Sequence, residues 1–152
     1  MNKDTAAEEL PGTIDRPAHT QEEIDAAADA YPYGTLHVGD TDGIWLEAPT
    51  GAGIEVEAHD GAQVDAVDGS RVYALAGAQV VAHTGSRVYA SDGSQVEAYE
   101  GSWVTALAGS KVVAYDGSRV SARAGSHVAA YEGASVEARE GASVVELIEE
   151  EA

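Results

Sequence analysis

Histidine and carboxylate side chains are the residues of this chain that could perform acid–base catalysis or hold a metal ion. The five histidines follow no recurring spacing and stand at His19, His37, His59, His83 and His127. No Ser-His-Asp spacing, phosphate-binding loop or paired-carboxylate motif accompanies them, and the absence of Cys removes thiolate chemistry. Among the outward-facing histidines, His59 and His83 are predicted to lie on opposite faces. We therefore expect no catalytic residues, no metal site, no cofactor and no enzymatic activity.

Acidic residues recur immediately before glycine, in stretches such as "DGS" and "YEGS". They are Asp60, Asp68, Asp92, Glu100, Asp116, Glu132 and Glu140. Calcium-binding β-rolls use a nine-residue repeat whose glycines and aspartates place several oxygen ligands around each ion. The repeat here has eight residues and one carboxylate per turn, so we expect a solvated acidic edge rather than a calcium site.

The positions of these residues follow from an eight-residue repeat that occurs twelve times between residues 53 and 148. Position 1 is always Gly, position 4 is always Val, and position 6 is Ala in eleven octads. Position 2 is Ser or Ala except at Ile54. Apolar residues at every second position predict a short strand, and the Gly predicts a tight turn.

The variable positions 3, 5 and 7 indicate how the octads stack. Seven identities occur at a spacing of 16 residues, whereas spacings of 8 and 24 give one each. The seven pairs are Gln63/Gln79, Gln79/Gln95, Arg71/Arg87, Tyr73/Tyr89, Tyr99/Tyr115, Tyr115/Tyr131 and Arg123/Arg139. We therefore predict an all-β fold: a two-sided parallel β-solenoid of about six coils with 16 residues per coil. An antiparallel hairpin meander is the alternative, but it gives no reason for identities at 16.

Two outward faces follow from this prediction. The odd octads provide a candidate partner-binding face, because arginine and aromatic residues are enriched at binding hot spots. Its residues are Arg71, Tyr73, Arg87, Tyr89, Trp103, Arg119, Arg123 and Arg139. The alternative is that these side chains only stack well on an exposed sheet. The even octads provide a more apolar candidate packing or self-association face, with Val81, Tyr99, Val113, Tyr115 and Tyr131.

The chain outside the octads predicts an arm, a cap and a tail. Residues 1–19 are expected to be an extended or flexible arm, and residues 20–52 a capping segment with short strands. Within the cap, "TQEE" from Thr20 is a capping box for a helix over residues 20–30. The solenoid is predicted over 53–148, followed by an acidic tail at 149–152. Because Glu146 replaces the inward Ala and acids follow it, we expect a finite object rather than a filament.

The formal net charge of −19 limits the partners of the protein. It disfavours direct binding to a nucleic-acid backbone and favours solubility, while mimicry of DNA is a minor alternative. The beginning of the chain shows no signal peptide, and no segment approaches transmembrane length, so we expect no membrane insertion. Localisation is left open, with a cytoplasmic or virion-associated protein as the options.

The octad pattern G-S-x-V-x-A resembles the repeat of bacterial ice nucleation proteins. "GSQVEAYE" and "GSKVVAYD" carry the Ser, Val, Ala and Tyr in the order found in that family's paired octads. The resemblance covers residues 53 to about 148 and implies a β-solenoid with a small-residue interior and a Tyr ladder. The family's outward Thr-x-Thr array is missing, because Thr84 and Thr105 are the only Thr in the octads and do not align.

These observations predict a non-enzymatic structural protein. The leading hypothesis is a rigid acidic solenoid that presents residue ladders to a protein partner or to copies of itself, as in a virion or surface assembly. The alternatives are an ice-binding surface template, which the family resemblance implies, and an acidic mimic of nucleic acid.

Overall fold

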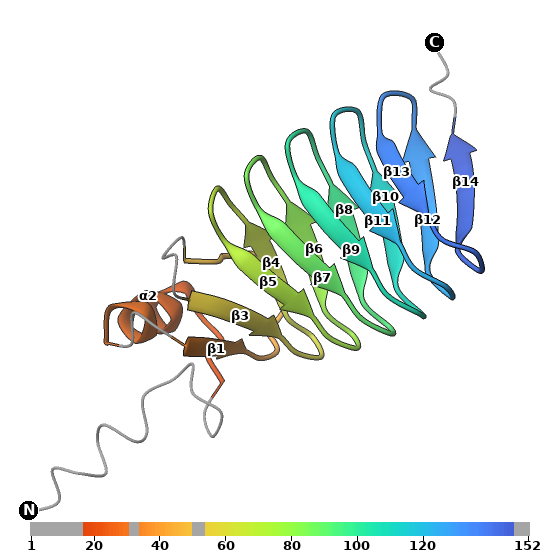
Figure 1. Ribbon diagram of the computed structural model, residues 1–152. Helices are drawn as coiled ribbons and strands as arrows, with labels where there is room; N and C mark the ends of the chain where they lie inside the picture. The colour runs from red at the N-terminus through yellow and green to blue at the C-terminus, as the bar shows by residue number, and fades with distance from the viewer. Residues whose placement is uncertain (1–16, 31–33, 50–53, 148–152) are drawn as a thin grey trace, which may run out of the picture.

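The computed structural model describes residues 17–30, 34–49 and 54–147, which form one helix and two seven-stranded parallel sheets (Figure 1). The odd-strand sheet contains β1 (Gly34–Val38), β3 (Ile54–Ala58), β5 (Arg71–Ala74), β7 (Arg87–Ala90), β9 (Trp103–Ala106), β11 (Arg119–Ala122) and β13 (Ser135–Ala138). The even-strand sheet contains β2 (Leu46–Glu47), β4 (Gln63–Ala66), β6 (Gln79–Ala82), β8 (Gln95–Ala98), β10 (Lys111–Ala114), β12 (His127–Tyr131) and β14 (Ser143–Leu147). The chain alternates between the sheets, so each turn of the solenoid contributes one strand to each.

The strand register confirms the predicted two-sided coil of 16 residues. Arg71 pairs with Arg87 and Tyr73 with Tyr89 in the odd-strand sheet. Gln63 pairs with Gln79 in the even-strand sheet. All of the strand pairs between described residues are parallel, which excludes the hairpin meander.

Each octad turns because its glycine adopts a backbone conformation that other residues rarely reach. Gly69 has φ 81°, and the amide of Ser70 donates to the carbonyl of Val67 at 2.9 Å, which closes a four-residue type II turn. The Ser70 hydroxyl donates to the same carbonyl at 2.6 Å. Seven serines at octad position 2 are buried in this way and satisfied within their own turns: Ser70, Ser86, Ser94, Ser102, Ser110, Ser118 and Ser126.

The core between the sheets consists of small side chains. The Val at position 4 and the Ala at position 6 point inward and are buried from Val56 to Ala130. Small residues let the two sheets approach closely without voids, which explains how a chain without Phe can form a core.

The N-terminal end of the stack is covered. Helix α2 (Gln21–Ala30) begins at Thr20, whose hydroxyl accepts the amide of Glu23 at 3.2 Å, and buries Ile24 and Ala27. The Gln21 side chain exchanges two hydrogen bonds with the backbone of Glu47, at 2.7 and 3.1 Å, and so occupies the outer edge of β2.

The first turn is formed by β1 and β2, and it makes seven turns where the octads predicted about six. The octad count missed this turn because its sequence departs from the repeat. Ala18 pairs with Val38 at the outer edge of β1, so residue 18 belongs to the folded end; the rest of the predicted arm up to residue 16 lies outside the described residues. The acidic tail at 149–152 also lies outside them.

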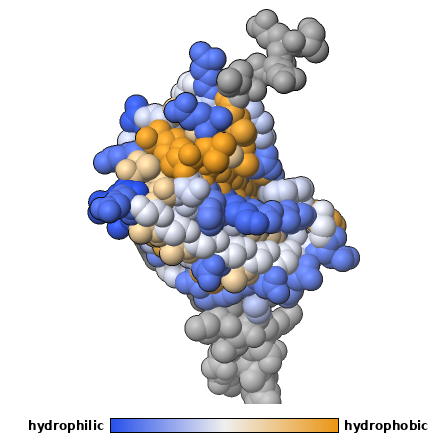
Figure 2. Space-filling model, turned by 90° about the vertical axis from the view of Figure 1, so that its right-hand side faces the viewer, coloured by the Kyte–Doolittle hydropathy of each residue, from blue (hydrophilic) through white to orange (hydrophobic). Residues whose placement is uncertain are grey.

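The C-terminal end of the stack is open over the residues that the structure describes. Val136 and Val144 occupy inward positions there but are only partly buried, and Glu146 is exposed. They line a hollow of about 520 Å³, and the view onto this end shows a patch of hydrophobic atoms (Figure 2). No helix among the described residues is long and apolar enough to cross a membrane.

Candidate interaction surfaces and a histidine cluster

Part of the predicted partner-binding face forms a continuous row. Arg71, Arg87, Trp103 and Arg119 occupy position 3 of four successive strands of the odd-strand sheet and lie in register. All four side chains are exposed, and Trp103 is 50% exposed. We call these four residues the Arg–Trp row.

Neighbouring side chains of this face stack along the solenoid axis. The Arg119 guanidinium lies 4.7 Å from the centre of the Trp103 ring, a cation–π distance. Tyr73 and Tyr89, half-buried beside the row, stack with their ring centres 4.9 Å apart. The stacking holds the rings at fixed positions on the sheet.

The arginines of the row carry no carboxylate partner among the residues that the structure describes. Every ion pair found there involves a histidine, at His37, His59 or His83. The guanidinium groups therefore remain available to other molecules, even though the chain has 27 acids and 8 Lys plus Arg.

The structure does not bring the remaining predicted arginines into this row. Arg123 and Arg139 occupy position 7, at the opposite end of their strands, and are exposed beside one another where the chain leaves the sheet. Four residues of extended chain, or about 13 Å, separate positions 3 and 7. The face predicted as one surface therefore consists of two rows, one at each edge of the sheet.

The predicted packing face contains a stack of three tyrosines. Tyr99, Tyr115 and Tyr131 follow one another with ring centres 4.7 and 5.1 Å apart and interplanar angles of 8°. His83 extends the stack, with its ring centre 5.9 Å from that of Tyr99.

Glu97 joins two of these tyrosines. The hydroxyl groups of Tyr99 and Tyr115 donate to the same Glu97 oxygen, at 3.3 and 3.4 Å. Burial first, and then the negative charge of Glu97, raise the pKa of Tyr99 and the pKa of Tyr115 above the ordinary value. The pKa of Tyr73 is raised in the same way by burial and by Glu55, which accepts its hydroxyl at 3.3 Å.

The valines of the packing face lie in the next row. Val81 and Val113 occupy position 5 on either side of Glu97 and are partly exposed. A shallow groove of about 310 Å³ runs over Val113, Gln79 and Gln95 and is bordered by Trp45. The sequence analysis did not select Trp45, which is 39% exposed and comes from the first turn. Its occurrence in a degenerate octad, where an apolar residue replaces the usual polar one, is the signal that could have selected it.

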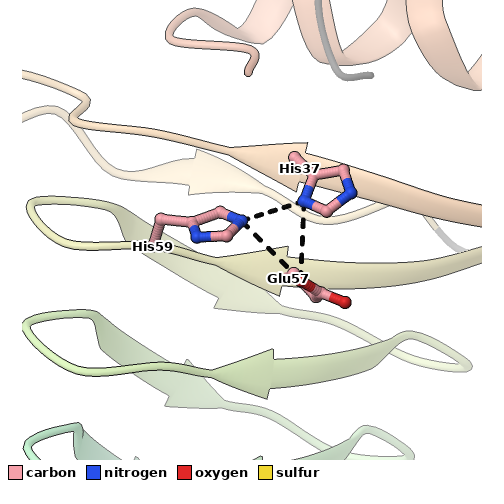
Figure 3. Close-up of side chains that lie close together, drawn as sticks. All are labelled: His37, Glu57 and His59. Carbon is pink, nitrogen blue, oxygen red and sulfur yellow. Dashed lines mark hydrogen bonds and ion pairs between the residues drawn. The ribbon is translucent and has the colours of Figure 1, made fainter. Parts of the chain in front are cut away.

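The structure brings together three residues that the sequence analysis left apart. His37 of β1, Glu57 of β3 and His59, directly after β3, point toward one another on the odd-strand sheet (Figure 3). Their donor atoms are 2.9 Å apart between His37 Nδ1 and His59 Nε2, and 3.5 and 3.7 Å from these nitrogens to Glu57 Oε1. We call these three residues the histidine cluster.

The cluster was missed because the first turn has a different length. β1 pairs with β3 at a spacing of 20 residues, which places His37 opposite Glu57, whereas the octads repeat at 16. The alternation of Glu57 and His59 in one strand was visible, but their partner was not.

Comparisons with known proteins give no match: no family model fits the sequence, and no curated protein or solved structure resembles the chain.

Proposed function

We propose that this protein is a non-enzymatic scaffold that binds a protein partner through the Arg–Trp row. The observation that carries the proposal is the set of exposed guanidinium groups that lack a carboxylate partner among the described residues, arranged around a half-exposed Trp103. Arginine and tryptophan are the residue types that most often dominate binding energy at protein interfaces.

The chemistry of the row defines the partner. Arginine side chains one strand apart, such as Arg71 and Arg87, repel one another, and a partner that places carboxylates between them relieves this repulsion. An acidic protein surface with an apolar patch for the Trp103 ring would fit. The rigid register of the sheet presets the spacing of the four side chains and lowers the entropy lost on binding.

Self-association through the even-strand sheet is a second candidate. It is supported by the groove over Val113 with Trp45 at its border, which gives an apolar surface on a face that is open to solvent. The resemblance to ice nucleation repeats leaves ice templating as a third candidate. A droplet-freezing assay separates it from the others, because a scaffold freezes droplets at the temperature of buffer alone.

The experiment that tests the leading proposal compares variants of the two faces. The full chain, a Trp103→Ala/Arg119→Ala variant and a Gln95→Ala/Lys111→Ala control are used to capture proteins from the native source. We expect a partner that the parent and the control retain and the first variant loses. The affinity of the purified partner should fall at least about tenfold with the first variant.

Two outcomes would contradict this proposal. One is a partner that binds equally to the parent and the Trp103→Ala/Arg119→Ala variant. The other is a partner lost only with the Gln95→Ala/Lys111→Ala control, which would assign binding to the even-strand sheet.

A further inference from the structure

We propose that the histidine cluster is a binding site for a divalent transition-metal ion of the zinc type. His37 Nδ1, His59 Nε2 and Glu57 Oε1 would supply the three protein ligands. Such a site goes beyond the scaffold proposed above, because it involves neither the Arg–Trp row nor a partner protein.

The distances between the donor atoms fit a tetrahedral ion. Ligand bonds of about 2.0 to 2.1 Å place two ligand atoms of a tetrahedral zinc about 3.3 Å apart. The three separations are 2.9, 3.5 and 3.7 Å, which scatter on both sides of that value. Metal binding therefore requires only small rotations of side chains that already converge (Figure 3).

The side chains have the freedom and the exposure that an ion needs to enter. His37 is held on β1 with 12% of its side chain exposed, while Glu57 and His59 are 35% and 38% exposed. The buried ligand fixes the site, and the two more exposed ligands adjust to the ion. The exposed side leaves room for water as a fourth ligand, as in zinc sites with three protein ligands.

The protonation states required by a metal are available without a charged intermediate. In the absence of metal, one of the two facing nitrogens carries a proton and donates it to the other across 2.9 Å. Metal binding needs a lone pair on both nitrogens. A shift of that proton to the other nitrogen of the same ring supplies this lone pair and keeps both imidazoles neutral.

The ligand types select the class of metal. Two imidazoles and one carboxylate suit zinc and its neighbours in the first transition row, whereas calcium and magnesium prefer oxygen ligands alone. The strongly acidic chain, with a formal charge of −19, raises the local concentration of cations of every kind. Nitrogen ligands are therefore the feature that would separate specific binding from this general attraction.

The position of the cluster defines what the metal would do to the fold. His37 belongs to β1 of the irregular first turn, and Glu57 and His59 belong to the first regular octad. A bound ion would link these two turns across a 20-residue segment, and it would stabilise the capped end of the solenoid.

The test is a titration of the chelator-treated full chain with zinc chloride, followed by calorimetry in near-physiological salt with excess magnesium. We expect one equivalent of zinc per chain and a rise in melting temperature. His59→Gln and Glu57→Gln should each lower the affinity at least about tenfold. His83→Gln is the matched control, because His83 faces Asp65 at 3.4 Å on the other sheet and is 47% exposed.

A second measurement does not depend on the variants being folded. Cobalt bound to the parent through nitrogen and oxygen ligands in a tetrahedral site should give visible absorption bands, which zinc then displaces. The proposal is overturned if the parent takes up no stoichiometric zinc in excess magnesium. It is equally overturned if folded His59→Gln binds as tightly as the parent, or if His83→Gln weakens binding as much as His59→Gln.

Discussion

At the scale of the residue, Glu97 shows how an outward ladder position acquires chemistry. Its carboxylate accepts the hydroxyl groups of two stacked tyrosines from adjacent turns. The neutral phenols donate to the carboxylate, whereas a phenolate would face a negative charge at the same place. The folded state therefore favours protonated Tyr99 and Tyr115 and raises the pKa of both.

Because these pKa values are raised on folding, their contribution to stability is fully present below the ordinary tyrosine value of 10.0. It is lost as the pH rises through the folded values. We predict that Glu97→Gln lowers the pKa of Tyr99 and Tyr115 toward the ordinary value, because it removes the charge and leaves the burial unchanged. Tyrosine-ring NMR signals followed in an alkaline titration measure this shift.

Glu55→Gln is the control, since it should shift Tyr73 and leave Tyr99 and Tyr115 unchanged. Equal titration of Tyr99 in the parent and in Glu97→Gln would show that the carboxylate does not influence the stack.

At the scale of the element, one octad encodes one strand and one turn. The alternation of Ser, Val and Ala assigns which side chains face inward, and the Gly with positive φ ends each strand. Neither signal depends on distant residues, which is why the strand positions and the buried faces could be predicted from the sequence. The edge contacts of α2 were less predictable, because the Gln21 side chain replaces a strand only where β2 happens to end.

The inward position 4 gives a direct test of the strand orientation. Val104 is 3% exposed between the sheets, so Val104→Asp should place an unpaired charge in the core. We predict that it lowers the free energy of unfolding by more than about 3 kcal/mol. Chemical denaturation followed by circular dichroism measures this loss.

Thr105→Asp is the matched control in the same strand, because Thr105 points outward and is partly exposed. It should change the stability by less than about 1 kcal/mol. If both variants unfold at the denaturant concentration of the parent, position 4 does not face the core.

At the scale of the whole molecule, the two ends of the stack differ. The first turn is covered by α2 and by Ala18, whereas the described part of the last turn exposes the inward residues of β13 and β14. Open strand edges beside an apolar hollow invite pairing with another solenoid. Glu146 occupies the inward register opposite Ala130 and adds a charge to that end.

We predict that Glu146→Ala, which restores the residue found at position 6 in the other octads, increases end-to-end self-association. The charge that Glu146 places in the hollow must be desolvated when two ends meet, and the variant removes it. Light scattering after size-exclusion chromatography, over a range of protein concentrations, measures the effect. Glu140→Ala, at a neighbouring turn position, controls for the change in net charge.

A Glu146→Ala variant that remains as monomeric as the parent at every concentration would contradict this prediction. So would equal association of Glu146→Ala and Glu140→Ala, because it would attribute the effect to net charge alone.

The sequence by itself determined the solenoid, its 16-residue coil, the buried Val and Ala positions and the two outward faces. These follow from local alternation and from like residues that recur at the coil length, as Tyr73 and Tyr89 do. Only the tertiary structure decided which irregular residues meet, such as His37 and Glu57 across a 20-residue turn, or Trp45 above the groove. Their positions depend on the lengths of the turns between strands and on side-chain directions at the ends of strands, and neither leaves a periodic trace in the sequence.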